Sequence, residues 1–250
     1  MRTKVLIILA LTLIATFPSC KKAPLSIGKI VTETRELPNF KEVHLNDDIS
    51  ITLVRSDTCY IEITTGENII GNIKTEVDGN ILTISNTSTL DWIRTYDYEL
   101  HATLYYKDIR NFIFSSSGTL KTDNQFNAPN SAYLYRFEID GGSGDLDILV
   151  NDCSSFVFAY KFGTSRVTLH GLNNDLIEIN KKSYGIFDAR NFQAKNVDIQ
   201  SKSPADCFIW ATESINAKIN HHGNIYYKGD PENIQVTYSE YAEGKLLPHN

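Results

Sequence analysis

The stretch that decides the fold is residues 141–186, GGSGDLDILVNDCSSFVFAYKFGTSRVTLHGLNNDLIEINKKSYGI. Turn residues recur in it at Ser143-Gly144, Gly163-Thr164 and Tyr184-Gly185, and the second members of these pairs lie 20 and 21 residues apart. A second set of turns falls roughly midway, as at Asn173-Asn174. Two turns and two short β-rich runs per period predict a β-solenoid, which stacks its rungs because no single rung can bury its own apolar face.

The same spacing extends over residues 110–244. Its other anchors and midway turns are Ser117-Gly118, Pro204-Ala205, His222-Gly223, Pro129-Asn130, Asn151-Asp152, Ala194-Lys195, Glu213-Ser214 and Asp230-Pro231. The predicted fold class is therefore all-β, a parallel β-helix with rungs of about 20 residues. The turn Ser201-Lys202-Ser203-Pro204 carries bulkier residues than the glycine turns, so we expect it to be less tight.

Residues 28–109 form an N-terminal β part of the same domain. Runs such as Asp48–Leu53 and Asn80–Ser85 alternate with period two, as half-buried strands do. The stretch Glu67–Lys74 fits a helical turn or a bent strand, and the sequence leaves open whether this part continues the same helix. Residues 245–250 are expected to form a frayed tail.

Residues 1–19 are typical of an export signal. Arg2 and Lys4 precede a mostly apolar run from Val5 to Phe17, which is too short to count as a membrane-spanning helix. A small residue and Cys20 follow directly, as in a loose bacterial lipobox. We predict that Cys20 carries a lipid anchor and that residues 20–27 tether it to the fold. The alternative is an ordinary signal peptide cleaved nearby.

Charge narrows the choice of partners. A mature chain from Cys20 loses Arg2 and Lys4 of the 24 basic residues and keeps 30 acidic ones. Such an acidic chain lacks the basic footprint that nucleic acids require. No basic amphipathic helix is present, so membrane attachment would rest on the lipid. The prediction is an outer-membrane lipoprotein of a cell envelope, and Lys21-Lys22 after the anchor favours the periplasmic side over the cell surface.

Three more cysteines, Cys59, Cys153 and Cys207, show no spacing typical of a zinc site. Two of them lie in strand-like runs, which favours buried free thiols. One disulfide with a spare thiol stays open as the alternative.

Several segments in a specific order resemble a known family. They are Thr34–Phe40, Asp48–Leu53, Thr65–Ile70, Ile73–Val77, Gly79–Ile84 and Gly223–Pro231, with Ser-Gly turns before strands in between. Together they resemble the head GIN domain family, found in lipoproteins of the Bacteroidetes. The resemblance implies a β-helical lipoprotein with pectin-lyase-like winding and no established catalytic residues. Adhesion is the function suggested for that family, and the possible ligands are a glycan or a protein.

Candidate chemistry is sparse. The paired carboxylates Asp47-Asp48, Asp140 and Asp145/Asp147 suggest a glycosidase or lyase, but Asp145 and Asp147 on one strand face lie roughly 7 Å apart, against about 5 Å in a retaining glycosidase. Stacked rungs would bring Asp147 near Arg166. The stretch Gly141–Asp147 resembles a calcium turn only once and out of step, so a turn before a strand explains it better.

The pair His221-His222 is adjacent in sequence, so on a strand the two rings would point to opposite faces and would not share a metal. We interpret it as surface polarity near a turn. We therefore predict no catalytic, cofactor-binding or metal residue, and no cofactor.

Two aromatic stripes indicate which side of the strands faces inward. One is Phe156, Phe158, Tyr160 and Phe162, and the other is Tyr133, Tyr135 and Phe137. The intervening positions are smaller or charged, so the aromatic side is predicted to line the core.

Three functions remain: a non-catalytic adhesion or binding module, a carbohydrate-active β-helix enzyme (a polysaccharide lyase or glycosidase), and a structural envelope protein. We favour the first. A cleft of several carboxylates with a basic neighbour would favour the enzyme, and a broad carboxylate-poor face would favour binding.

Overall fold

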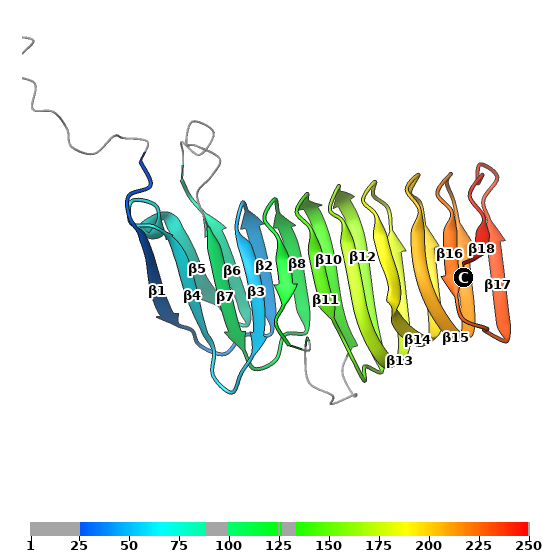
Figure 1. Cartoon of the computed structure of the whole chain (residues 1–250), viewed down its shortest axis with the longest axis horizontal. Helices are drawn as coiled ribbons and strands as arrows, with labels where there is room; N and C mark the ends of the chain where they lie inside the picture. The colour runs from blue at the N-terminus through cyan, green and yellow to red at the C-terminus, as the bar shows by residue number, and fades with distance from the viewer. Residues whose placement is uncertain (1–25, 89–99, 125, 127–133, 250) are drawn as a thin grey trace, which may run out of the picture.

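The chain winds into a β-solenoid whose strands lie across its long axis (Figure 1). The computed structural model describes residues 26–88, 100–124, 126 and 134–249. Parallel bridges about 21 residues apart wind the chain through about six turns, so the predicted all-β solenoid is confirmed. The described residues include one short 3-10 helix, η1 (Ile70–Asn72), and no helix long and apolar enough to cross a membrane.

Two sheets form the walls of the solenoid, and strands β13, β14 and β15 belong to both. Sheet I comprises, in spatial order, β5 (Ile73–Asp78), β6 (Ile81–Asn86), β2 (Glu42–Asp47), β8 (Asn111–Ser116), β10 (Leu134–Gly142), β12 (Ser155–Gly163), the second halves of β13–β15, and β17 (Asn233–Tyr238). Sheet II comprises β1 (Ile30–Glu36), β4 (Tyr60–Gly66), β7 (His101–Tyr106), β3 (Ser50–Arg55), β9 (Leu120–Thr122), β11 (Leu146–Leu149), the first halves of β13 (Val167–Lys181), β14 (Phe187–Ser201) and β15 (Cys207–Ile219), then β16 (Ile225–Lys228) and β18 (Leu246–Pro248).

The predicted midway turns at Asn173-Asn174, Ala194-Lys195 and Glu213-Ser214 are bends within continuous strands. The parallel ladders shift register there, between Gly171 and Asn174 for example, without ending. Asn173 takes a left-handed φ of 59°, which Asn tolerates better than most residues. The corner is therefore bulged, and the rung passes from sheet II to sheet I without losing its hydrogen bonds.

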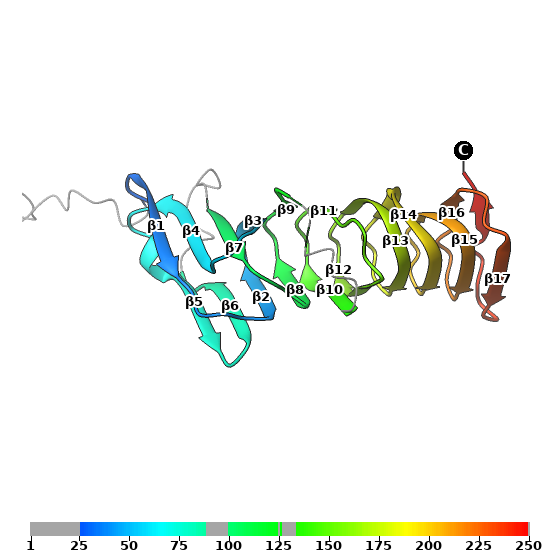
Figure 2. The same ribbon diagram turned by 90° about the horizontal axis from the view of Figure 1, so that it is seen from below.

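The N-terminal part joins the solenoid and also closes its end. Strands β2 and β3 form a regular rung that pairs in parallel with β8 and β9. The intervening β4–β7 segment adds antiparallel pairings, β4 with β7 and β5 with β6, and β1 pairs antiparallel with β4 (Figure 2). The stretch Glu67–Lys74, for which the sequence allowed two conformations, holds η1 and the start of β5.

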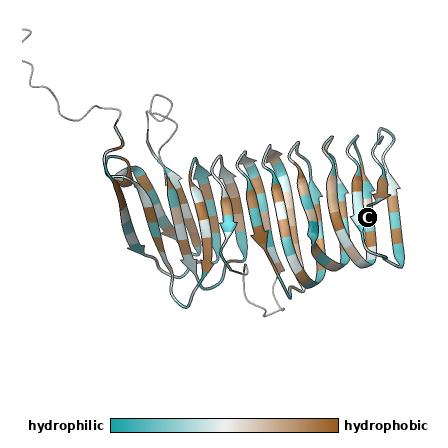
Figure 3. Ribbon diagram, viewed as in Figure 1, coloured by the Kyte–Doolittle hydropathy of each residue, from teal (hydrophilic) through white to brown (hydrophobic). Residues whose placement is uncertain are grey.

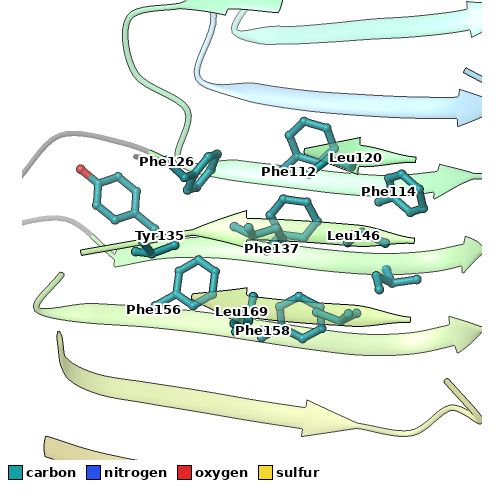
Figure 4. Close-up of a cluster of buried hydrophobic side chains, with 14 of the residues drawn as sticks. Phe112, Phe114, Leu120, Phe126, Tyr135, Phe137, Leu146, Phe156, Phe158 and Leu169 are labelled. Atoms are coloured by element: carbon teal, nitrogen blue, oxygen red, sulfur yellow. The ribbon is translucent and has the colours of Figure 1, made fainter. Parts of the chain in front are cut away.

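Hydrophobic and hydrophilic residues alternate along the strands (Figure 3), and in β7 and β8 every second residue is buried. In the middle rungs the core is an aromatic ladder (Figure 4). Phe137 stacks on Phe112 and Phe158 with ring centroids 4.8 and 5.9 Å apart and nearly parallel planes. Phe158 in turn contacts Phe187 at 4.9 Å. Such pairs stabilise the core beyond the area that they bury, by about 0.5–1.5 kcal/mol each.

The predicted inward stripes are confirmed for Tyr135, Phe137, Phe156, Phe158 and Tyr160, which are all buried. The prediction is wrong for Phe162, which is 69% exposed. The ladder slips by one residue here, because Ile139 pairs with Tyr160 but Asp140 pairs with Phe162. This bulge turns Phe162 to the outer side. Tyr133 lies outside the described residues.

Glycines form a column at the tight corner between the end of sheet I and the start of sheet II. A Cβ on Gly144 would overlap the carbonyl oxygen of Gly118, one rung earlier. A Cβ on Gly244 would meet the oxygen of Gly223 in the same way, and Gly223 itself lies against Ala205. The rungs approach so closely here that only a hydrogen fits. Gly144 has no positive φ, so the close approach of the Gly118 carbonyl, and not the backbone conformation, excludes a side chain there.

Near its C-terminus the chain is ordered and forms a strand. A frayed tail from Lys245 is wrong for Leu246–Pro248, since these residues form β18 and pair in parallel with β16. The short run adds a last strand to sheet II because the edge of β16 is free.

Cys59, Cys153 and Cys207 are buried free thiols, as predicted. Burial raises the pKa of Cys207 to about 12, so this thiol stays protonated and unreactive.

Candidate binding surface

The outer face of sheet II carries aromatic side chains at its C-terminal end. Cys207 and Ile209 of β15 point into the core, so strand alternation turns Phe208 and Trp210 outward. Tyr226 of β16 lies beside Phe208 in the ladder register and also points outward. We call this cluster the aromatic patch, made up of Phe208, Trp210, Tyr226, His249, Arg190 and Lys228.

Ring contacts connect the aromatic side chains of the patch. Phe208 and Tyr226 stack with centroids 5.2 Å apart and an interplanar angle of 16°. His249, just after β18, meets both rings edge-on at 5.9 and 6.2 Å. All three outer positions sit on adjacent strands, so the sheet itself fixes their spacing.

Two cations of the aromatic patch lie over its rings. The guanidinium of Arg190 lies 4.7 Å from the centre of the Phe208 ring, and Lys228 Nζ lies 3.9 Å from that of Trp210. Arg190 is held by a two-pronged ion pair with Asp188. Hydrogen bonds from Arg190 lower the pKa of the Asp188 carboxyl, which keeps the pair ionised. The result is a column of stacked rings with Arg190 over Phe208 and Lys228 over Trp210, a partly exposed aromatic and cationic surface on the outer face of sheet II.

A second aromatic pair lies on the same outer face near the N-terminal end. Tyr60 of β4 and Tyr105 of β7 stack at 4.1 Å with planes 7° apart. Tyr105 Oη donates to Glu62 at 3.4 Å. This pair has no cation stacked on it among the described contacts, and it joins antiparallel strands, where cross-strand stacking stabilises the sheet.

The acidic residues considered for catalysis are spread over the molecule. Asp47 and Asp48 both accept from Asn86 at 2.8 Å, which ties β2 to β6. Asp147 faces His170 at 3.0 Å on the next rung. Arg166, the expected neighbour of Asp147, lies two residues before Thr168, the residue that pairs with Asp147 in the ladder.

The other two candidates are structural as well. Asp140 lies 3.9 Å from Lys161, half exposed. Asp145 is an exposed turn residue whose backbone carbonyl accepts from Leu120 at 2.9 Å. The stretch Gly141–Asp147 comprises the end of β10, a turn at residues 143–145 and the start of β11, so it is a turn before a strand, as the sequence predicts.

His221 and His222 lie in the turn before β16. Their rings are perpendicular with centroids 4.4 Å apart, and His222 Nδ1 lies 2.8 Å from Glu243. A hollow of about 440 Å³ opens beside them. Within the described ranges, no three His, Cys, Asp or Glu side chains come together in a way that would hold a metal ion.

Sheet I presents a different outer face. Glu138 lies almost buried there between Arg136 at 2.7 Å and Lys161. Burial pushes the pKa of Glu138 upward, but the two charge-assisted hydrogen bonds outweigh it and the pKa is lowered. Further along, a shallow hollow of about 350 Å³ is lined mainly by polar side chains: Glu178, Asn180, Asp198, Gln200, Asn216 and Lys218. Around Glu138 and this hollow, the described side chains of the face are mainly polar and charged.

Sequence reasoning missed both the aromatic patch and a lysine inside the core. The signal for the patch was the outward parity of Phe208 beside inward Cys207, with Tyr226 18 residues later. Lys181 shares the parity of Ile177 and Ile179 and is fully buried. Its ammonium donates to Ser203 Oγ at 3.1 Å and to the carbonyls of Ala205 and Asp206 at 2.6 and 3.2 Å. It binds the corner of the next rung.

This architecture agrees with the comparisons. Residues 39–231 match the family described as "Putative auto-transporter adhesin, head GIN domain", and the chain belongs to that family, as the resemblance implied. No relative was found among the curated proteins.

Solved structures share the fold. A "putative adhesin" from Bacteroides fragilis is 21% identical, with a TM-score of 0.72 over 88% of this chain and 97% of that one. A "putative adhesin" from Parabacteroides merdae is 19% identical, with a TM-score of 0.54 over 89% and 97%. A "putative lipid binding protein" from Parabacteroides distasonis is also 19% identical, with a TM-score of 0.58 over 89% and 98%.

Proposed function

We propose that this protein is a non-catalytic adhesion module of the cell envelope, and that its aromatic patch contacts the ligand. The family and its structural relatives support an adhesive role. The single feature that carries the choice of surface is the partly exposed stack of Phe208 and Tyr226, with Arg190 over Phe208 and Lys228 over neighbouring Trp210. Aromatic and arginine side chains supply most of the binding energy in recognition surfaces.

A glycan is the ligand class that we favour. The C–H groups of a sugar ring pack on aromatic side chains, and its hydroxyls reach polar groups nearby. The patch offers partly exposed aromatic carbons and polar groups beside them, since Asn224 Nδ2 lies 3.3 Å from Tyr226 Oη. The acidic residues considered for catalysis are spread over the part of the chain that the structure describes, whereas acid–base catalysis needs two groups within reach of one substrate atom.

The test is a glycan array and a polysaccharide pull-down with the chain from Lys21, which keeps every described strand. Phe208→Ala with Trp210→Ala should weaken binding at least about tenfold, equivalent to about 1.4 kcal/mol. Tyr60→Ala with Tyr105→Ala is the matched control on the same face and should leave binding unchanged. Equal losses in both variants, or none in either, would reject the patch. Release of sugar products would replace adhesion by enzymatic cleavage.

We further propose that a lipid on Cys20 anchors the chain in the outer membrane, facing the periplasm. An apolar leader directly before Cys20, and Lys21-Lys22 after it, support this arrangement. Cys20→Ser should move the protein out of the membrane fraction. A variant that stays there would contradict the anchor, and removal of the wild type by protease added to intact cells would place it on the surface instead.

A further inference from the structure

The C-terminal end of sheet I is an edge without the usual protection against pairing. Each sheet ends in a strand with one partner: β1 and β18 in sheet II, β5 and β17 in sheet I. Strands β1 and β5 each carry three charged residues, and β18 is short and ends in Pro248. Charge, proline and short length are the devices that keep edges from pairing. Strand β17, Asn-Ile-Gln-Val-Thr-Tyr, has six residues and none of these devices.

The inward side of β17 leaves the core open at this end. Ile234, Val236 and Tyr238 lie in register with buried Ile215, Ala217 and Ile219 of β15, so they face the interior. Ile234 and Tyr238 are nevertheless 42% and 51% exposed. No later rung covers them within the part of the chain that the structure describes.

The backbone of the same three residues points to the free edge. Ser239 N donates to Ile219 O at 3.0 Å, so the polar groups of Ser239 face β15. Successive residues of a strand direct their N–H and C=O groups to opposite edges. Those of Ile234, Val236 and Tyr238 therefore point away from β15 and are available to another strand.

We propose that β17 pairs with β17 of a second copy of this chain, antiparallel about a two-fold axis at Val236. In this register Val236 faces itself, and Ile234 faces Tyr238 of the other copy. All three inward residues then exchange backbone hydrogen bonds in both directions, and the apolar sides of the two strands stay on one side of the joined sheet. A symmetric register of this kind is what an isologous dimer requires. The two cores would continue into each other through sheet I.

Charge at the ends of β17 sets how this dimer responds to salt. The same register places Glu232 opposite Glu240 of the second copy, and Asp230 and Glu243 lie close by in the flanking turns. Like charges in facing positions destabilise pairing, and salt screens exposed charges. Dimerisation should therefore strengthen as ionic strength rises. Glu240→Lys should strengthen it at low salt by replacing the repulsion with attraction.

The decisive experiment measures oligomeric state by sedimentation of the chain from Lys21. We expect a concentration-dependent dimer that Val236→Pro converts to monomer, because proline lacks the N–H that faces the free edge and that no bond within the chain uses. Thermal melting of Val236→Pro monitors the fold. Val236→Ala keeps the N–H and should still dimerise.

Cross-linking tests the register. Paired Val236 Cα atoms would lie about 5.5 Å apart, within reach of a disulfide. Val236→Cys should give a covalent dimer on mild oxidation, whereas Gln235→Cys, which faces Thr237 and not itself, should cross-link far more slowly. A wild type that sediments as a monomer at every concentration and salt level would overturn the proposal. A folded Val236→Pro variant that still sediments as a dimer would overturn it as well. Both results are independent of glycan binding.

Discussion

The N-terminal part and the repeated rungs share the alternation of apolar and polar residues, but their strands pair differently. In β10 to β18 each strand pairs in parallel with a strand one rung away, and the core is a stack of rings around Phe137. The ladders of β1, β4 and β5 are antiparallel, and the core there is mainly aliphatic. The difference shows that alternation decides which side of a strand is buried, whereas the recurrence of rungs decides which strand is its neighbour.

Removing a ring from the aromatic ladder should have the largest effect. Phe137 is fully buried between Phe112 and Phe158. Phe137→Ala should lower the free energy of unfolding by about 3–5 kcal/mol, since it removes a large apolar group and leaves a cavity between rungs. Denaturant unfolding measures it. Ile63→Val in β4 is the comparison from the N-terminal part, at about 0.5–1.5 kcal/mol. Equal losses of unfolding free energy in the two variants would contradict a large contribution of the aromatic ladder to stability.

The glycine column gives the next largest effect. Gly144→Val places side-chain atoms against the Gly118 carbonyl, so we expect a loss of about 1–3 kcal/mol or more from forced backbone shifts. Gly71→Ala in η1 meets open space and should change stability little. Asp145→Asn, on the exposed turn beside Gly144, should stay within about 0.5 kcal/mol. Melting temperatures of the three variants measure these losses. Similar shifts of the melting temperature in all three would contradict the close approach of the rungs at Gly144.

Lys181 links a rung to the next one through its buried ammonium, and its contribution should depend on pH. Burial lowers the pKa of Lys181 below its ordinary 10.5, against a weaker opposing influence of Cys207 and Asp206. Between the lowered pKa and 10.5 the unfolded chain binds more protons than the folded chain, so stability rises with pH in that window.

The measurement is the free energy of unfolding of wild type and Lys181→Met at several alkaline pH values. The wild type should gain on the variant as the pH rises, by at most about 1.4 kcal/mol per pH unit for one proton. Below the window the difference should be constant. Parallel pH profiles would show that the ammonium is not desolvated.

The smallest effect is expected at the stacked pair in the antiparallel part. Tyr105→Leu keeps apolar area on the outer face but removes the stacking with Tyr60. The loss should be about 0.5–1.5 kcal/mol. A double-mutant cycle with Tyr60→Leu isolates the coupling between the two rings, and a coupling near zero would show that the stack contributes nothing to this end of the solenoid.

The sequence by itself determined the solenoid, the positions of its corners and most of the inward side chains. Small turn residues every 20 or so positions and period-two alternation are local properties, visible without coordinates. Tyr135, Phe137, Phe156 and Phe158 were placed correctly for this reason. The acidic charge and the lack of clustered ligands likewise left binding as the favoured function.

Tertiary structure decided what depends on neighbours distant in the chain. The antiparallel pairings of β4 with β1 and β7 join segments that are distant in the sequence, so no local pattern predicts them. A one-residue bulge turned Phe162 outward, and pairing with β16 ordered the last strand. The aromatic patch exists only because adjacent rungs bring Phe208, Tyr226 and Arg190 side by side. The local sequence determines which side chains of a strand are apolar. The register of a strand and the identity of its neighbour are set by packing of the whole chain.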